Sequence, residues 1–219
     1  MLAGPGSGKT HSFLERIREL TANRGVSFEE ICYITFIREI ANAFRADYDD
    51  RFGVQAAGGG TPRISTLHSF ACSLIRNQGF RHGYDGDLYF LNVTEKNDDG
   101  ATIFLEDLLS EVNFGGIWTV TQLRNLLKEI KTAWRDDVDP RGLPDPAARI
   151  TELTLQFSRV YRLADWDYTV PLAHRLLREG GELPSWVARL KHFMVDEYQD
   201  FNAAEQSFLQ TLTGRADSV

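Results

Sequence analysis

The pattern of apolar and polar positions over the first third of the chain alternates between helix and strand. Apolar side chains recur at helical spacing in HSFLERIREL, residues 11–20, and Ser27–Glu30 has the pattern of a capping box that opens a short helical turn. The compact apolar run Ile31–Phe36 is typical of a strand buried on both faces of a parallel sheet. We expect it to be followed by a helix to about Arg51, a short strand Arg63–Thr66 and a helix His68–Gln78. This alternation predicts an α/β fold, a parallel sheet flanked by helices.

The pattern changes after about Thr94, where almost only helical periodicity is found as far as Leu163. The proline-rich segment Asp139–Pro146 separates the helices there. We therefore expect an all-helical subdomain, residues 93–163, inserted into an α/β domain built from residues 1–92 and 164–219. Beyond the insertion, Asp167 is expected to cap a helix that ends at Gly180-Gly181, and His192–Asp196 to restore an apolar strand.

Composition is ordinary for a globular protein, with 42% apolar and 25% charged residues. Apolar runs are far shorter than the ~20 residues of a membrane span, and no secretory signal is found, so we expect a cytoplasmic protein with no membrane partner. Cys32 and Cys72 lie far apart and indicate neither a metal cluster nor a disulfide framework. The net charge is −7, but residues 34–82 carry a small excess of Arg, so a DNA-facing surface would lie there. An ordinary distribution of solvent-exposed charges would explain that excess of Arg about as well.

The segment AGPGSGKT, residues 3–10, fits the pattern of a phosphate-binding P-loop in relaxed form, with Ala3 in place of the first glycine. Glycines can take positive φ and leave no side chain in the way of a phosphate, and backbone N–H groups at the start of the following helix point at the anion. Lys9 would reach the β- and γ-phosphates of ATP, and the Thr10 hydroxyl would ligate Mg²⁺. The residues expected to bind the nucleotide are Gly4, Gly6, Ser7, Gly8, Lys9 and Thr10.

A second acidic site is predicted in KHFMVDEYQDFN, where an apolar strand ends in Asp196-Glu197. Asp196 would complete the Mg²⁺ site with Thr10, and Glu197 would orient and deprotonate the water that attacks the γ-phosphate. Taken alone, such a pair is more often a solvated strand end. The P-loop elsewhere in the chain reverses that preference and makes Lys9, Asp196 and Glu197 the candidate catalytic residues.

AGPGSGKT, ITF, STLHSF and VDEYQD, in this order, resemble the N-terminal motor domain of UvrD/Rep-type superfamily 1 DNA helicases. The resemblance covers essentially the whole chain, and DEYQD is its most specific element. It implies a RecA-like P-loop NTPase fold with a helical insertion, ATP and Mg²⁺ as ligands, and single-stranded DNA as partner. The parent protein would move 3′ to 5′ along DNA.

The resemblance also assigns further residues. Gln199 would connect the nucleotide site to neighbouring elements. Single-stranded DNA would be contacted by Thr35, Phe36, Thr66 and His68, and by Arg38 where the family usually has another residue. On the sequence alone Phe36 could equally be a core aromatic, His68 a helix cap and Arg38 a solvent-facing side chain. The stretch Asp165–Val170 also resembles a family segment. We expect it to cap a helix near the motor core and assign it no catalytic role.

The family has an adenine-binding glutamine upstream of the loop and a second motor domain that supplies arginines to the phosphate, and neither is found in these residues. We therefore expect a P-loop that is poorly anchored, and an isolated chain that binds nucleotide or DNA without catalysis of its own. A P-loop kinase for a small metabolite is the remaining alternative, but it leaves STLHSF and DEYQD unexplained. DNA-stimulated against metabolite-stimulated hydrolysis would separate the two.

Overall fold

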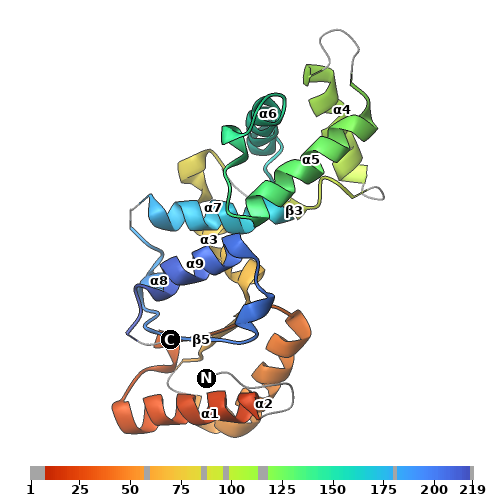
Figure 1. Cartoon of the computed structure of the whole chain (residues 1–219). Helices are drawn as coiled ribbons and strands as arrows, with labels where there is room; N and C mark the ends of the chain where they lie inside the picture. Colours follow the sequence, from red (N-terminus) through yellow and green to blue (C-terminus); the bar gives the residue numbers. More distant parts are fainter. Residues whose placement is uncertain are drawn as a thin grey trace. The chain divides into compact units, whose positions relative to one another are not determined.

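The computed structural model describes residues 8–56, 60–84, 88–95, 99–112, 118–179 and 182–217 (Figure 1). The chain divides into two compact units, each built from more than one segment of sequence. Unit 1 comprises residues 1–69, 182–201 and 210–219, and unit 2 comprises residues 70–181 and 202–209. The predicted α/β class, with parallel strands flanked by helices, is confirmed.

The sheet of unit 1 has three parallel strands in the order β2-β1-β5, namely β2 (Arg63–Thr66), β1 (Ile31–Thr35) and β5 (His192–Val195). All five residues of the central strand β1 are buried, as its continuous apolar run predicted. Tyr33 is paired with Ile64 on one side and with Met194 on the other. The bounds predicted for β2 are those observed, and the sheet is parallel as expected.

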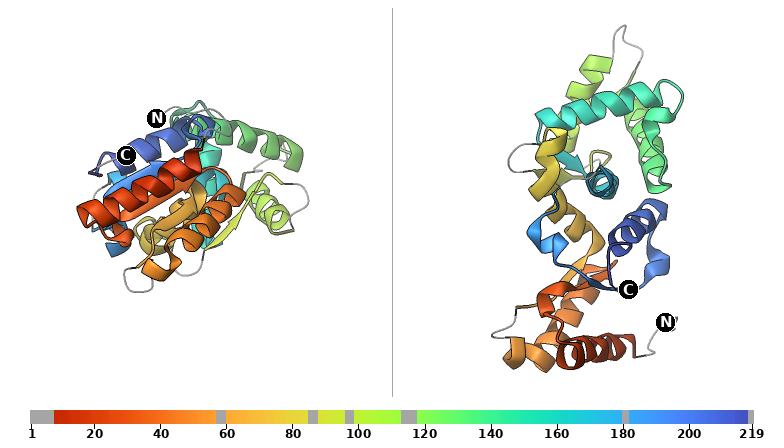
Figure 2. Two further views of the ribbon diagram at one scale, coloured as in Figure 1. Left: turned by 90° about the horizontal axis from the view of Figure 1, so that it is seen from below. Right: turned by 90° about the vertical axis from the view of Figure 1, so that its left-hand side faces the viewer.

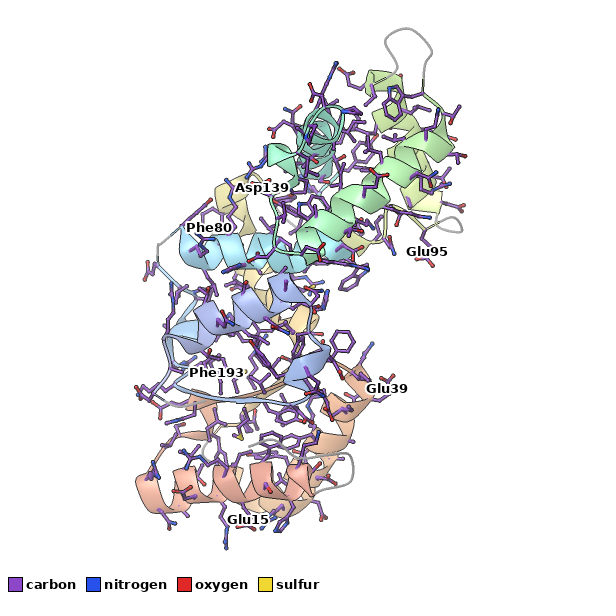
Figure 3. The ribbon with its side chains drawn as sticks, in the orientation of Figure 1. Glu15, Glu39, Phe80, Glu95, Asp139 and Phe193 are labelled. Atoms are coloured by element: carbon purple, nitrogen blue, oxygen red, sulfur yellow. The ribbon has the colours of Figure 1, made fainter. Side chains whose placement is uncertain are left out.

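Two helices of unit 1, α1 (Lys9–Arg18) and α2 (Arg38–Ala56), run side by side (Figures 1 and 2). Their apolar side chains share one buried cluster with β1, β2 and β5, in which the rings of Tyr33 and Phe44 stack at 3.8 Å. At the surface, Glu15 of α1, labelled in Figure 3, forms an ion pair with Arg51 of α2. Arg51 was expected to lie near the end of α2, but the helix continues to Ala56.

The connection into β1 follows the sequence closely. α1 continues as a π-helical turn, Glu19–Asn23, and Gly25 has a positive φ of 67°, which ends the helix. The capping box predicted at Ser27–Glu30 is present and opens a short 3₁₀ turn, η2 (Phe28–Glu30). The other short elements of this unit are α8 (Ser185–Ala188) and η5 (Tyr198–Asp200).

Unit 2 is mainly helical. The helical periodicity found between Thr94 and Leu163 corresponds to α4 (Asp99–Val112), α5 (Val120–Arg135) and α6 (Ala147–Val160), with the 3₁₀ turn η4 (Pro140–Gly142) before α6. The unit also contains η3 (Gly79–His82), α7 (Trp166–Arg178) and most of α3 (Leu67–Gln78) and α9 (Ala203–Thr213). None of the helices in the described ranges is long and apolar enough to cross a membrane.

Two features of unit 2 differ from the prediction. It contains a small parallel sheet of β3 (Tyr89–Leu91) and β4 (Leu163–Asp165), which the sequence did not indicate because three-residue strands are too short to show a period of two. The cap assigned to Asp167 was wrong. Asp165 caps α7, since its carboxylate accepts a hydrogen bond from the Asp167 N–H at 2.9 Å, while the Asp167 side chain contacts Lys131 and Arg135.

Candidate nucleotide-binding site

The candidate site lies at the carboxyl edge of the sheet in unit 1. Because β2, β1 and β5 are parallel, their last residues Thr66, Thr35 and Val195 all lie at this edge, which is where α/β sheets bind their ligands. Asp196 and Glu197 follow β5 directly. The sheet therefore presents the predicted acidic pair at the edge where a ligand is expected.

The amino end of α1 meets this acidic pair. Lys9, its first residue, forms an ion pair with the carboxylate of Glu197, and its Nζ lies 3.6 Å from Oδ1 of Asp196. Gly8 precedes the helix with a positive φ of 76°, no side chain of the described residues caps this end, and its first turn carries no acidic residue. An uncapped amino end beside a lysine suits a bound anion, because backbone N–H groups and the helix dipole both favour negative charge there.

Asp196 is held in one orientation. Only 7% of it is exposed, and its Oδ2 accepts a hydrogen bond of 2.8 Å from the Tyr33 hydroxyl. Its other oxygen, Oδ1, accepts the N–H of Glu197 at 3.0 Å, and its own N–H donates to the Ile34 carbonyl at 2.8 Å. Burial raises the pKa of the Tyr33 hydroxyl, and its hydrogen bond to Asp196 raises that pKa further. The hydroxyl therefore remains protonated and donates the bond.

Glu197 is more exposed and has an unusual backbone. Its φ of 52° and ψ of 43° place it in the left-handed region, which a side chain other than glycine rarely adopts without cost. The amide of Gln199 donates a hydrogen bond to one carboxylate oxygen of Glu197, and Lys9 contacts the other. The hydrogen bond with Lys9, and then that with Gln199, lowers the pKa of Glu197, and the same contact raises the pKa of Lys9.

The chemistry of these residues fits Mg²⁺. Thr10 is exposed in the first turn of α1, and Asp196 is fixed by Tyr33, so a hydroxyl and a carboxylate oxygen are offered as hard donors. The carboxylates of Asp196 and Glu197 already lie beside one cation, the Lys9 ammonium. Of the predicted loop residues, Gly8, Lys9 and Thr10 are described. Gly4, Gly6 and Ser7 lie outside the described residues, and so does the expected anchoring of the loop.

Comparison with known proteins identifies the family. The sequence model of the UvrD/REP helicase N-terminal domain matches residues 1–219. The chain belongs to this family. It is 26% identical over 225 residues to the ATP-dependent DNA helicase Rep of Escherichia coli (strain K12), a match that covers 98% of this chain and 32% of that helicase. It is 25% identical over 219 residues to the ATP-dependent DNA helicase PcrA of Staphylococcus aureus (strain COL), covering 98% of this chain and 29% of PcrA. The chain thus spans about a third of the length of these relatives.

In this helicase domain, the aromatic residue predicted to stack on DNA follows β1. Phe36 is 44% exposed, and its ring meets that of Phe201 edge to face at 5.6 Å. It is therefore neither a core residue nor fully solvent-facing. Arg38, the first residue of α2, is exposed beyond it.

The three other predicted DNA contacts lie in different environments. Thr66 caps α3, accepting the Ser69 N–H at 3.2 Å and donating to the Ser69 hydroxyl at 2.9 Å. His68 is half-buried in the first turn of that helix. Thr35 is completely buried and its hydroxyl makes no hydrogen bond with the described residues. In this structure Thr35 is not accessible to a ligand, whereas Thr66 and His68 are partly accessible.

Sequence reasoning missed Tyr33 as a member of the site of this helicase domain. The signal that could have found it is its polar hydroxyl in the apolar run ICYITF, on the strand beside the one that ends in Asp196. A buried tyrosine hydroxyl needs a partner, and the carboxylate at the end of the neighbouring strand supplies one.

Proposed function

We propose that this domain binds Mg-ATP and single-stranded DNA, and that it is the N-terminal motor domain of an ATP-dependent helicase that moves 3′ to 5′ along DNA. The observation that carries the proposal is the convergence of Lys9, Asp196 and Glu197 at the carboxyl edge of the parallel sheet. A metabolite kinase is set aside, because the helicase family model matches the whole chain.

Each residue has a role that follows from its surroundings. Lys9 and the backbone N–H groups at the start of α1 bind the β- and γ-phosphates, because both present positive charge to an anion. Thr10 and Asp196 would hold Mg²⁺, which when bound neutralises phosphate charge. Glu197, positioned by Gln199, orients and deprotonates the attacking water.

The ion pair between Lys9 and Glu197 affects how readily Glu197 can act as the base. While Lys9 contacts it, the pKa of Glu197 is held low and the carboxylate is a poor proton acceptor. Phosphate oxygens compete for the Lys9 ammonium. Bound nucleotide would therefore release the Glu197 carboxylate to act on water.

DNA binding is assigned to the same edge of the sheet. Phe36 exposes part of its ring and can stack on a base without reading its identity, worth ~1–3 kcal/mol per base. Arg38 is available to a phosphate, and His68 and Thr66 offer further polar contacts. Thr35 is buried at the end of β1, and no contact with DNA is assigned to it.

A second candidate function is binding without independent catalysis. In the family that the sequence resembles, arginines from a second motor domain stabilise the transferred phosphoryl group, and in related systems such a residue changes the rate by ~10³–10⁵. These 219 residues alone are therefore expected to bind nucleotide and DNA with near-background hydrolysis. A single-turnover ATPase assay on the purified chain decides this, since robust activity would refute it.

The role assignment is tested with Lys9→Ala and Glu197→Gln. In the helicase that carries this domain, both variants should lose DNA-stimulated ATP hydrolysis. In the chain itself, Lys9→Ala should weaken binding of a fluorescent ATP analogue, whereas Glu197→Gln should not. Lys191→Ala is the matched control, because Lys191 forms an exposed ion pair with Glu30 at the amino edge of the parallel sheet, opposite the candidate site. Undiminished turnover in both variants would contradict the assignment.

A further inference from the structure

Unit 2 contains a cavity of about 430 Å³ lined by residues of α5, η4, α6 and α7, which we call the α7 cavity. Part of its lining is apolar and buried, namely the side chains of Trp134, Leu155 and Tyr168. The volume lies within the range of about 300–1,000 Å³ that is usual for pockets that hold small molecules. The cavity therefore has room for a small ligand and an apolar surface to receive part of it.

The charged residues of the lining are balanced in number. Three carboxylates and three guanidinium groups line the α7 cavity, so it has no net charge. Two of each are paired with one another, since Arg141 binds Asp139, labelled in Figure 3, and Arg175 binds Glu179 at 2.5 Å. A neutral lining does not attract a polyanion, because nucleic acid is bound through an excess of positive charge.

Asp137 and Arg178 are the two charged residues of the lining that remain. Both are exposed, and neither side chain forms an ion pair or a hydrogen bond with the described residues. Burial lowers the pKa of His174, and the charges of Asp137 and Arg178 act on that pKa in opposite directions, so both groups lie near the imidazole. One carboxylate and one guanidinium are thus available to a ligand in the same cavity.

The backbone holds Asp137 in a conformation that favours glycine. Its φ is 60°, and it follows α5 at the position where a glycine commonly ends a helix. The N–H groups of Asp137 and Val138 donate to the carbonyls of Trp134 and Ala133, which completes the end of the helix. An aspartate is strained at this position and a glycine is not, and strain of this kind is concentrated at ligand sites.

We propose that the α7 cavity binds a small zwitterion with an apolar body, namely a free amino acid with an apolar side chain. Its ammonium pairs with Asp137, and its carboxylate pairs with Arg178, whose planar guanidinium can donate two parallel hydrogen bonds to a carboxylate. Its side chain packs on the apolar part of the lining and is removed from water. A ligand with a single charge would leave Asp137 or Arg178 without a partner. The proposal is separate from the proposed function in unit 1.

The probe for this site is L-phenylalanine, and its binding to the 219-residue chain is measured by isothermal titration calorimetry. Two analogues each lack one charge, since 3-phenylpropionate has no ammonium and phenethylamine has no carboxylate. We expect each analogue to bind about 10-fold more weakly than L-phenylalanine. This is the low end of the effect of one hydrogen bond to a charged group, because both groups of the protein are hydrated in the empty cavity.

Two variants assign the two charges. Asp137→Gly and Arg178→Gln should each weaken L-phenylalanine binding about 10-fold. In Asp137→Gly, L-phenylalanine and 3-phenylpropionate should bind equally, and in Arg178→Gln, L-phenylalanine and phenethylamine should bind equally. Asp137→Gly should also raise the midpoint of urea denaturation, because glycine takes a positive φ without strain. Weaker binding by a more stable protein cannot result from unfolding.

Unit 2 offers a matched control for each variant. Arg162 also has a positive φ, 52°, and is exposed outside the α7 cavity, so Arg162→Gly changes the backbone in the same way without removing a lining charge. Arg149 is an exposed arginine of α6 that does not line the cavity, so Arg149→Gln is the control for Arg178→Gln. Both controls should bind L-phenylalanine as the unaltered chain does.

Three results would overturn the proposal. The first is that the unaltered chain does not bind L-phenylalanine. The second is equal binding of L-phenylalanine and both analogues, which would mean that the two charges are not recognised. The third is undiminished binding in both Asp137→Gly and Arg178→Gln, which would place the ligand elsewhere. Each of these results leaves the proposed function intact, because titrations with nucleotide and with oligo(dT) test that function separately.

Discussion

The Tyr33 hydroxyl donates a hydrogen bond of 2.8 Å to Oδ2 of Asp196, joining the central strand of the sheet to the carboxylate at the end of its neighbour. The same ring stacks on Phe44 at 3.8 Å with the ring planes 2° from parallel. The position of the candidate metal-binding carboxylate is therefore determined by packing between β1 and α2. The Tyr33 side chain therefore belongs both to the core and to the candidate nucleotide site.

Replacing Tyr33 by phenylalanine should keep the stacked ring and remove the hydrogen bond. Asp196 is buried and would lose a charge-assisted partner, so we expect the free energy of unfolding to fall by about 1.5–3 kcal/mol. Mg²⁺-dependent nucleotide affinity should fall as well, because the carboxylate is no longer held in one orientation. Urea denaturation and titration with a fluorescent nucleotide measure the two effects.

Tyr48 of α2 provides the control. It is also buried, but its hydroxyl makes no hydrogen bond with the described residues. Tyr48→Phe should therefore leave the free energy of unfolding and the nucleotide affinity unchanged, or raise stability slightly. Equal losses of stability and nucleotide affinity in Tyr33→Phe and Tyr48→Phe would show that the hydrogen bond to Asp196 contributes to neither.

The left-handed backbone of Glu197 predicts a conflict between stability and activity. A residue with a Cβ pays about 1–2 kcal/mol in this conformation and glycine does not, although glycine is also more flexible in the unfolded chain. Glu197→Gly should consequently be about 0.5–1 kcal/mol more stable than Glu197→Gln, while both lack the candidate base and hydrolyse no ATP. Urea denaturation of the two variants measures the difference. A less stable Glu197→Gly would mean that the turn is not strained.

The sequence predicted the local features of unit 1 well, because they depend on neighbours. The capping box at Ser27, the apolar run of β1 and the bounds of β2 are each encoded within a few consecutive residues. The acidic pair and Lys9 were found for a similar reason, since a P-loop and an acidic strand end are recognisable motifs. Their mutual contact is a consequence of three parallel strands sharing one edge.

Features that depend on distant partners were not predictable. Strands β3 and β4 are three residues each, and they pair across more than seventy positions of sequence. The cap of α7 could have been Asp165 or Asp167, which lie two residues apart. The choice depends on Lys131 and Arg135, which bind Asp167 from α5, and no sequence pattern places α5 beside α7.

His174 of α7 predicts a pH dependence of stability. It is 8% exposed, and burial lowers its pKa below the ordinary 6.5, with Arg178 acting in the same direction and Asp137 against it. Below about 6.5 the unfolded chain therefore binds more protons than the folded one, so stability falls as the pH falls towards the folded pKa. His174→Gln should show a flatter dependence between neutral and mildly acidic pH. Parallel curves for the two proteins in urea denaturation would contradict this.

Lys131 in unit 2 carries a buried positive charge whose loss should be costly. Its side chain is 6% exposed and lies 3.0 Å from both Asp165 and Asp167, with further hydrogen bonds to Asn92 at 2.6 Å and Thr94 at 3.2 Å. Burial already raises the pKa of Asp165, and Lys131 is the cation that opposes this rise. Lys131→Met would leave that carboxylate buried without a counter-charge. We expect about 3–5 kcal/mol of destabilisation in urea denaturation.

A second cation that binds Asp167 gives the comparison for Lys131. Arg135 also binds Asp167, but its side chain is 58% exposed, so Arg135→Met should cost at most about 1 kcal/mol. Adding Asp165→Asn to Lys131→Met should recover part of the loss, because the unpaired charge is removed. If Arg135→Met is as harmful as Lys131→Met, or if Asp165→Asn brings no recovery, burial of the charge is not the cause. The two cations differ in their access to water and in their partners, since Lys131 also contacts Asp165, Asn92 and Thr94, and the Asp165→Asn variant separates the effect of the buried charge from the loss of these contacts.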